Sequence, residues 1–226
     1  MVVPDASAWM RQGEWAAATA RGAEPPYWVR IWPASVALAR LLWRRGSLAG
    51  LRVLDLGCGL GVPGIAACRA GASVTFADVQ ASALAFASWN AARQGNEVKP
   101  EVRQFDWLRA DLTDVFDLLL LADVSYRPLH HAALRRHALG CLSPGGVVVH
   151  ADPLRRESGA FVRWLHENLA TIERQTSISF LGARVDVRLC IAAREADALL
   201  PWRAIVPGGG SGPDCGPDTP NLASSR

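Results

Sequence analysis

The chain has 226 residues, half of which are hydrophobic, and its formal net charge is +3 at pH 7. This length and composition predict one globular domain with a full hydrophobic core. The basic residues form no consecutive block and no apolar run reaches the ~20 residues that span a bilayer, so we expect neither a nucleic-acid partner nor a membrane partner.

The first part of the chain, residues 1–24, predicts a helical extension with a helix over roughly 5–20. The proline pair at 25–26 ends this helix and begins an extended segment. Over residues 34–45 apolar side chains recur at helical spacing, and Gly46 is placed as the C-terminal cap of a second helix.

The middle of the chain alternates between strand and helix patterns, which is typical of a doubly wound sheet. The strands are predicted over 52–56, 73–77, 101–105, 115–121 and 146–151. The helices between them are predicted over 62–70, 81–94 and 129–141.

The last part of the domain predicts a helix near 156–169 and two β-rich runs, 172–181 and 184–193. Gly182-Ala183 separates these runs, so we expect them to pair as an antiparallel hairpin. The fold class is therefore α/β, a doubly wound, Rossmann-like sheet of seven strands that ends in this hairpin. The glycine-rich residues 207–226 cannot bury an apolar face and predict a disordered tail, which leaves 25–206 as the domain.

The most informative segment is VLDLGCGLG at residues 53–61, which predicts a buried strand running into a glycine-rich turn. Glycine lets the backbone approach a ligand closely, and Pro63 suits the first turn of a following helix. Asp55 lies two positions before the first glycine. This Asp-x-Gly-x-Gly-x-Gly pattern is typical of S-adenosylmethionine-dependent methyltransferases and predicts that cofactor. The alternative is a tight turn that binds nothing.

Acidic residues follow the next two predicted strands. Asp78 lies about twenty residues beyond the glycine turn, where a carboxylate can accept hydrogen bonds from both ribose hydroxyls. Asp106 could accept from an adenine amino group, and Trp107 could cover the ring. The alternatives are helix-capping aspartates and a packing tryptophan.

The fourth predicted strand delivers Ala122, Asp123 and Tyr126 to the same edge of the sheet. The pattern Asp123-x-x-Tyr126 indicates a catalytic pair because it follows a methyltransferase-type glycine turn. An (Asp/Asn)-Pro-Pro-Tyr motif is absent there, and the Pro-Pro-Tyr at 25–27 lies upstream of the first strand, where we expect no such role. An aliphatic amine is therefore favoured over an amide or a nucleobase as methyl acceptor.

Residues 25–194 resemble the seven-β-strand protein lysine methyltransferases of the methyltransferase-like group. The segment YWVRIWP at 27–33 is similar to that family's tryptophan-containing upstream segment. The resemblance places Asp123 and Tyr126 beside the transferred methyl group. It also implies cofactor contacts from Trp32, Gly57, Cys58, Gly59, Asp78, Trp107 and Ala122.

One branch of that family acts on the electron-transfer flavoprotein β subunit, and Asp152-Pro153-Leu154-Arg155 is similar to its Gly-Asp-Pro-Gly-Arg segment. Ala151 and Leu154 stand where the branch has glycines. The resemblance implies a protein-lysine N-methyltransferase with a protein partner, the electron-transfer flavoprotein β subunit.

Three other functions stay open. A small-molecule N-methyltransferase of the nicotinamide type would share the fold and most cofactor motifs. A nicotinamide-cofactor oxidoreductase is compatible with Gly59, Gly61 and Gly64, which satisfy Gly-x-Gly-x-x-Gly, but not with Asp55, the Asp123-x-x-Tyr126 pattern or the terminal hairpin. A binding module without chemistry is the third.

The protonation of the acceptor is also open. A lysine amine must lose its proton to attack, and its ordinary pKa is near 10.4. Aromatic walls would lower that pKa, whereas an ion pair with Asp123 would raise it. Our hypothesis is that Asp123 orients the amine and Tyr126 shapes the acceptor channel.

The cysteines and histidines suggest no metal site. The five cysteines are widely spaced without a Cys-x-x-Cys pair, so we expect free thiols in a reducing compartment, the cytoplasm, in a monomeric protein. His130, His131 and His137 are expected at the surface or in a helix rather than around a metal.

Overall fold

The structure is a computed structural model that describes residues 1–5, 26–95 and 99–205. The helix expected over 5–20, and with it most of the expected extension 1–24, lies outside the described residues, as does the expected tail 207–226. None of the helices within the described ranges combines the length and apolar character needed to cross a lipid bilayer.

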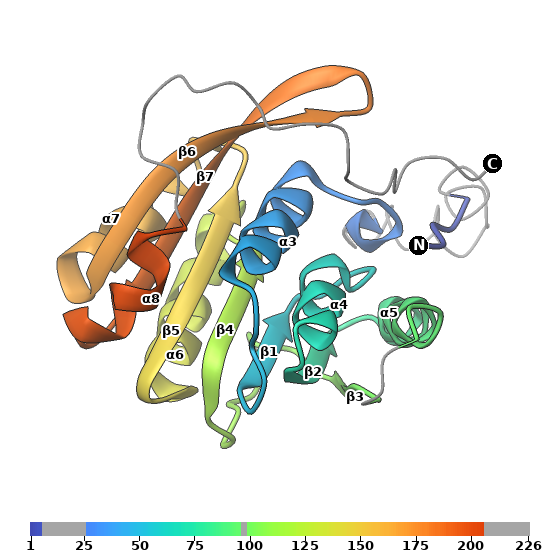
Figure 1. Cartoon of the computed structure of the whole chain (residues 1–226), viewed down its shortest axis with the longest axis horizontal. Helices are drawn as coiled ribbons and strands as arrows, with labels where there is room; N and C mark the ends of the chain where they lie inside the picture. Colours follow the sequence, from blue (N-terminus) through green and yellow to red (C-terminus); the bar gives the residue numbers. More distant parts are fainter. Residues whose placement is uncertain (6–25, 96–98, 206–226) are drawn as a thin grey trace.

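The strands form one sheet of seven in the order β3-β2-β1-β4-β5-β7-β6 (Figure 1). The first five run parallel to one another, and β7 lies antiparallel between β5 and β6. The predicted fold class is confirmed. The bounds are β1 Arg52–Leu56, β2 Ser73–Asp78, β3 Glu101–Gln104, β4 Phe116–Ala122, β5 Leu142–Asp152, β6 Ala170–Phe180 and β7 Ala183–Ala193.

Helices cover both faces of the sheet, in front and behind in Figure 1. One face packs against α3 (Pro33–Arg45), α4 (Val62–Arg69) and α5 (Ala81–Ala92), and the other against α6 (His131–Gly140) and α7 (Gly159–Asn168). The strands alternate between the two cores, as Leu118 and Leu120 do against Leu119 and Leu121. Because both faces are buried, β4 is apolar almost throughout.

Short helices complete the chain. The 3-10 turn η3 (Ala196–Leu199) and helix α8 (Leu200–Arg203) follow β7, and Leu199 and Trp202 join the core beside α3. Two further 3-10 turns, η1 (Tyr27–Val29) and η2 (Pro128–His130), precede α3 and α6.

Two local predictions were wrong. The segment after the proline pair, expected to be extended, forms η1, in which the Val29 N–H donates to the Pro26 carbonyl at 3.0 Å. The hairpin turns at Leu181-Gly182 rather than Gly182-Ala183, with φ of 50° and 79°. Two successive positive φ values are what a two-residue type I′ turn requires, so Ala183 is free to begin β7.

Candidate active site

The predicted site residues gather where the strand order changes direction. β1 lies between β2 and β4, so the chain leaves β1 toward one side and later returns on the other. In open α/β sheets, ligands bind at this switch point, outside the carboxyl ends of the strands. Gly57, Asp78 and Asp123 come at or directly after the ends of β1, β2 and β4.

The glycine turn after β1 is pressed closely by neighbouring side chains. Gly57 has φ of +71°, and a Cβ built there would lie 2.7 Å from Val124 Cγ1 and 2.9 Å from Trp107 Cζ3. The structure therefore brings Trp107 and the segment after β4 against the turn. Only glycine fits at position 57, on grounds of both φ and space.

Asp55 stabilises the glycine turn through a buried hydrogen bond. Its Oδ2 accepts a hydrogen bond from the Gly64 N–H at 2.9 Å, which ties β1 to the first turn of α4. The side chain is 1% exposed, and burial raises the pKa of Asp55 to about 7. Asp55 thus acts on the turn through Gly64 and does not open onto the crevice.

Asp78 ends β2 and faces the same turn. Its Oδ2 accepts from the Gly59 N–H at 3.0 Å and its Oδ1 from the Gln80 N–H at 2.9 Å. Burial raises the pKa of this carboxyl above its ordinary value. The contact with Gln80 closes a local turn before α5 without capping the helix, and the contact with Gly59 places the carboxylate at the glycine turn.

The carboxylate of Asp123 forms an ion pair with an arginine. Arg155 Nε lies 2.6 Å from Asp123 Oδ1 and Arg155 Nη2 lies 2.8 Å from Oδ2, a bidentate pair. The Asp123 side chain is 4% exposed and that of Arg155 is 34% exposed. The guanidinium also lies over the Trp32 ring, 5.8 Å from its centroid. Arg155 was not predicted as a site residue, so this partner of Asp123 was missed.

Arg155 is fixed in turn by the corner that follows β5. Its backbone N–H donates to Asp152 Oδ1 at 2.8 Å, and the buried Asp152 carboxylate also accepts from Arg188 Nε on β7 at 3.0 Å. Leu154, between them, has φ of +57°, a left-handed conformation that favours glycine. The corner therefore sets the position of the arginine that meets Asp123.

A series of contacting aromatic rings connects the segment upstream of β1 with the residues that follow β3. Tyr126 meets Tyr27 with ring centroids 5.6 Å apart and His130 at 5.8 Å. His130 in turn meets Trp107 at 5.7 Å. Burial raises the pKa of Tyr126 to about 12, so its phenol stays protonated at neutral pH. Tyr27 was not predicted for the site, because nothing in the spacing shows that a residue upstream of β1 returns to β4.

The glycine turn, the acids at the strand ends and the aromatic rings of the site lie within one stretch of sequence. Residues 27–167 match a family described as "Lysine methyltransferase". The chain belongs to this lysine methyltransferase family. The matched stretch includes the glycine turn, Asp78, Trp107, Asp123 and Arg155.

Curated relatives of this lysine methyltransferase family member include methyltransferases named for different acceptors. Electron transfer flavoprotein beta subunit lysine methyltransferase from Danio rerio is 36% identical over 135 residues, covering 58% of this chain and 52% of that protein. Histone-arginine methyltransferase METTL23 from Xenopus laevis is 34% identical over 108 residues, covering 45% of this chain and 46% of that protein. The chain spans about half the length of these relatives.

Solved structures share the fold. N-methyltransferase NodS from Bradyrhizobium japonicum, in complex with S-adenosyl-L-homocysteine, aligns with a TM-score of 0.56 at 18% identity, covering 70% of this chain and 85% of that one. Ribosomal protein L11 methylase from Lactobacillus delbrueckii aligns with a TM-score of 0.55 at 25% identity, covering 71% and 79%. The seven-stranded sheet of this family member is thus a class I methyltransferase fold.

Three predicted cofactor residues have mainly local contacts. Asp106 accepts from the Leu108 N–H at 2.9 Å and pairs with Arg109 at 3.2 Å, both within a turn that follows β3. Cys58 is buried in the turn, and burial raises its pKa well above the ordinary value. Ala122 ends β4, half-buried and paired with Ala151 of β5.

The surface alternative for the histidines was wrong, whereas the helix alternative holds for His131 and His137, which lie in α6. His130, at the end of η2, and His131 and His137, in α6, are all buried. His131 Nε2 lies 2.9 Å from the Ser125 carbonyl, and the Ser125 hydroxyl lies 2.7 Å from His150 Nε2. Burial lowers the pKa of His150 to about 4, so it is neutral at physiological pH. This network supports the β4 loop that carries Asp123 and Tyr126.

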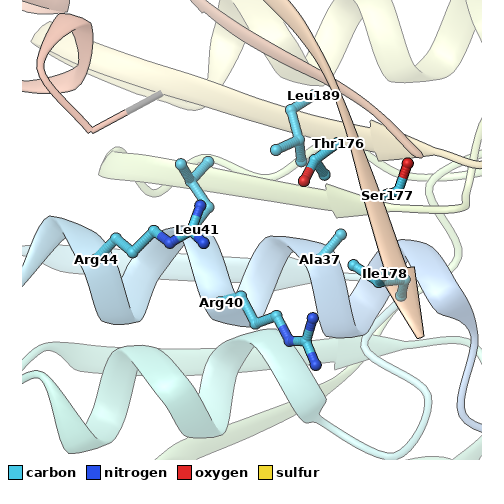
Figure 2. Close-up of a pocket in the computed structure, with 8 residues that line it drawn as sticks. All are labelled: Ala37, Arg40, Leu41, Arg44, Thr176, Ser177, Ile178 and Leu189. Carbon is cyan, nitrogen blue, oxygen red and sulfur yellow. The ribbon is translucent and has the colours of Figure 1, made fainter. Parts of the chain in front are cut away.

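A separate small cavity of about 50 Å³ lies between α3 and the β6–β7 hairpin (Figure 2). Arg40 and Arg44 come from the helix side, and Thr176 and Ser177 come from the strand side. None of its lining residues was predicted for the active site.

Asp55 and His150 are expected to give opposite pH dependences of stability. Folded protein holds the Asp55 proton to about pH 7 whereas the unfolded chain releases it near pH 4, so stability falls as pH rises through this window, by about 4 kcal/mol. The unfolded chain protonates His150 near pH 6.5 and the folded protein only near pH 4, so stability falls as pH drops between these values.

Asp55→Asn should therefore leave the contribution of His150 to the pH dependence of stability without the opposing contribution of Asp55. The variant keeps an oxygen for the Gly64 N–H but loses the ionisation, so its free energy of unfolding should rise with pH between about 4 and 7 more than that of the wild type. Urea denaturation of the cofactor-free protein at several pH values measures this difference. The exposed Asp186→Asn is the matched control, and parallel curves for wild type and Asp55→Asn would contradict the assignment.

Proposed function

We propose that this protein transfers the methyl group of S-adenosylmethionine to the side-chain amine of a lysine in a protein. The observation that carries the proposal is the family match over residues 27–167. The glycine turn and the Asp123–Tyr126 pair lie within that stretch, at the switch point of the sheet.

The residues around the glycine turn fit the cofactor. Val124 and Trp107 pack against Gly57 so closely that no Cβ fits there, and this contact places the Trp107 ring at the glycine turn, where it could cover an adenine ring. Each oxygen of Asp78 accepts one backbone N–H and retains a lone pair, which suits a ribose hydroxyl. The cofactor brings an electrophilic methyl group on a sulfonium. We assign its binding to Trp32, Asp55 through Gly64, Gly57, Cys58, Gly59, Asp78, Asp106, Trp107 and Ala122.

The acceptor is proposed to reach the methyl group beside Asp123 and Tyr126. Tyr27 and Tyr126 form apolar walls that would desolvate an incoming amine, which lowers its pKa and favours the neutral, attacking form. Orientation by fixed groups can supply several kcal/mol of the rate enhancement. Asp123 and Tyr126 are therefore the proposed catalytic residues.

The proposed protein substrate is the electron-transfer flavoprotein β subunit. The Danio rerio relative is named for this substrate, and the segment Asp152-Pro153-Leu154-Arg155 resembles that branch's Gly-Asp-Pro-Gly-Arg segment. Arginine is the second candidate acceptor, because other relatives are named histone-arginine methyltransferase.

Tritiated S-adenosylmethionine tests the function directly. Purified protein is incubated separately with electron-transfer flavoprotein, with histones, and with nicotinamide and small amines, and labelled products are identified by mass spectrometry. We expect label on a lysine of the β subunit. Label on arginine or only on a small amine would overturn the lysine assignment. Lys99 is the chain's single lysine, so self-labelling is easily recognised.

We further propose a monomer in the cytoplasm whose methyltransferase domain spans residues 25–206, flanked by an extension and a tail. The thiols of Cys58, Cys68, Cys141 and Cys190 are all free, which suits a reducing compartment. Light scattering after size-exclusion chromatography would measure the oligomeric state.

A further inference from the structure

The ion pair between Arg155 and Asp123 reduces the net negative charge beside the proposed position of the acceptor amine. Asp123 has a small exposed fraction, 4% of its side chain, and the Arg155 guanidinium pairs with both of its oxygens. Arg155 is held by its own backbone contact with Asp152 and by the Trp32 ring. The two charges thus form a fixed pair at the end of β4.

A bare carboxylate would hinder methyl transfer in one respect. It would bind a lysine as the ammonium ion and raise its pKa, and an ammonium nitrogen has no lone pair with which to attack. When the carboxylate is already paired with a guanidinium, the positive charge offsets much of its attraction for an ammonium ion. Each of its oxygens still has a lone pair, which can accept an N–H from a neutral amine.

We propose that Arg155 is a positioning residue that makes Asp123 orient the acceptor as a neutral amine instead of trapping it as an ammonium ion. This inference rests on the proposed function and adds to it the protonation state in which the acceptor is held.

Other charged and titratable groups surround this pair. Arg188 is hydrogen-bonded to Asp152, so its charge is already matched. Tyr126 is a protonated phenol at neutral pH, and burial lowers the pKa of His130. Within the described part of the chain, the further groups whose charges act on Arg155, Tyr126 or His130 are Tyr27, Asp78, Asp106, Arg127, His131 and Glu157.

The test is the pH dependence of kcat with electron-transfer flavoprotein as acceptor. In Arg155→Met the unpaired carboxylate should raise the acceptor pKa, so the acid limb of the profile moves to higher pH. For every pH unit by which the acid limb moves, kcat at neutral pH should fall about tenfold. The KM for the acceptor should stay equal or fall, because the ammonium form binds better.

Two further variants separate charge from structure. Arg155→Lys keeps the positive charge, so its acid limb should stay close to that of the wild type. Asp123→Asn/Arg155→Met removes both charges, so its acid limb should return toward the wild-type position and its kcat should exceed that of Asp123→Asn alone, a non-additive result. S-adenosylhomocysteine affinity and thermal unfolding establish that each variant is folded.

The outcomes are distinct. An unshifted acid limb in Arg155→Met, with kcat lowered equally at every pH, makes Arg155 structural and overturns the inference alone. A lower KM with higher kcat makes it a competitor of the acceptor and overturns it as well. Failure of the wild type to label any lysine overturns the proposed function and this inference together.

Discussion

Asp123→Asn is expected to reduce methyl transfer about 100-fold or more while S-adenosylhomocysteine binds as in the wild type. The amide cannot accept both guanidinium contacts, so Arg155 is left with an unmatched charge close to the proposed acceptor. The acceptor loses the oxygen that orients it and gains a repulsive neighbour. Initial rates with tritiated cofactor, alongside calorimetric titration of S-adenosylhomocysteine, measure the two effects separately.

Asp186→Asn is the matched control for this substitution. Asp186 is an exposed aspartate on β7 that accepts a hydrogen bond from Ser177, so the same chemical change occurs without reaching the crevice. Its rate should equal that of the wild type. Near-normal turnover by Asp123→Asn would remove Asp123 from the catalytic residues.

Gly57→Ala is expected to abolish cofactor binding and to lower the melting temperature. The new methyl group would lie 2.7 Å from Val124 Cγ1 and 2.9 Å from the Trp107 ring, so both side chains must move. Such overpacking costs about 1–3 kcal/mol, in addition to about 1–2 kcal/mol for a left-handed alanine. Displaced Trp107 and Val124 would also distort the surface on which the cofactor is proposed to lie.

Gly50→Ala separates these two costs. Gly50 has φ of +82°, and nothing lies within 4 Å of a Cβ placed there. The control should show the backbone penalty alone and keep its affinity for S-adenosylhomocysteine. If Gly57→Ala binds S-adenosylhomocysteine as tightly as Gly50→Ala does, the glycine turn is not the cofactor site.

The sheet and the glycine turn were predictable because they depend on local patterns. The apolar central strands, the helices that follow most of them, and the acids at the strand ends are all visible in the sequence. Parallel pairing then brings the carboxyl ends together, so Asp78 and Asp123 were expected at one edge.

What could not be predicted depends on loop conformation. Arg155 reaches Asp123 because a left-handed residue lies at each of two corners, Asp123 itself and Leu154, and no spacing rule gives that geometry. Tyr27 meets Tyr126 only because η1 folds back toward β4. The burial of His137 depends on which side of α6 faces the sheet.

The spacing of the acids identified residues but not the atoms they contact. Asp55 was expected to bind the cofactor, and the structure shows it bound to the Gly64 N–H inside the protein. Asp78 was expected to bind ribose, and its oxygens already accept two backbone N–H groups. The position of the motif therefore locates the glycine turn. Burial and hydrogen bonding show which of its residues stabilise the turn and which remain able to contact a ligand.

Leu154 has a backbone conformation that favours glycine, although the residue is not glycine. Its φ of +57° is one that glycine adopts freely, and glycine is the residue that the resemblance implies at this position. The corner keeps this conformation because Asp152 anchors the backbone of Arg155 and Asp123 anchors its guanidinium. A residue other than glycine can therefore hold this conformation, because the contacts on either side of it fix the corner. A pattern search that demanded the glycine would overlook chains like this one, whereas a search for the aspartate and arginine three residues apart would find them.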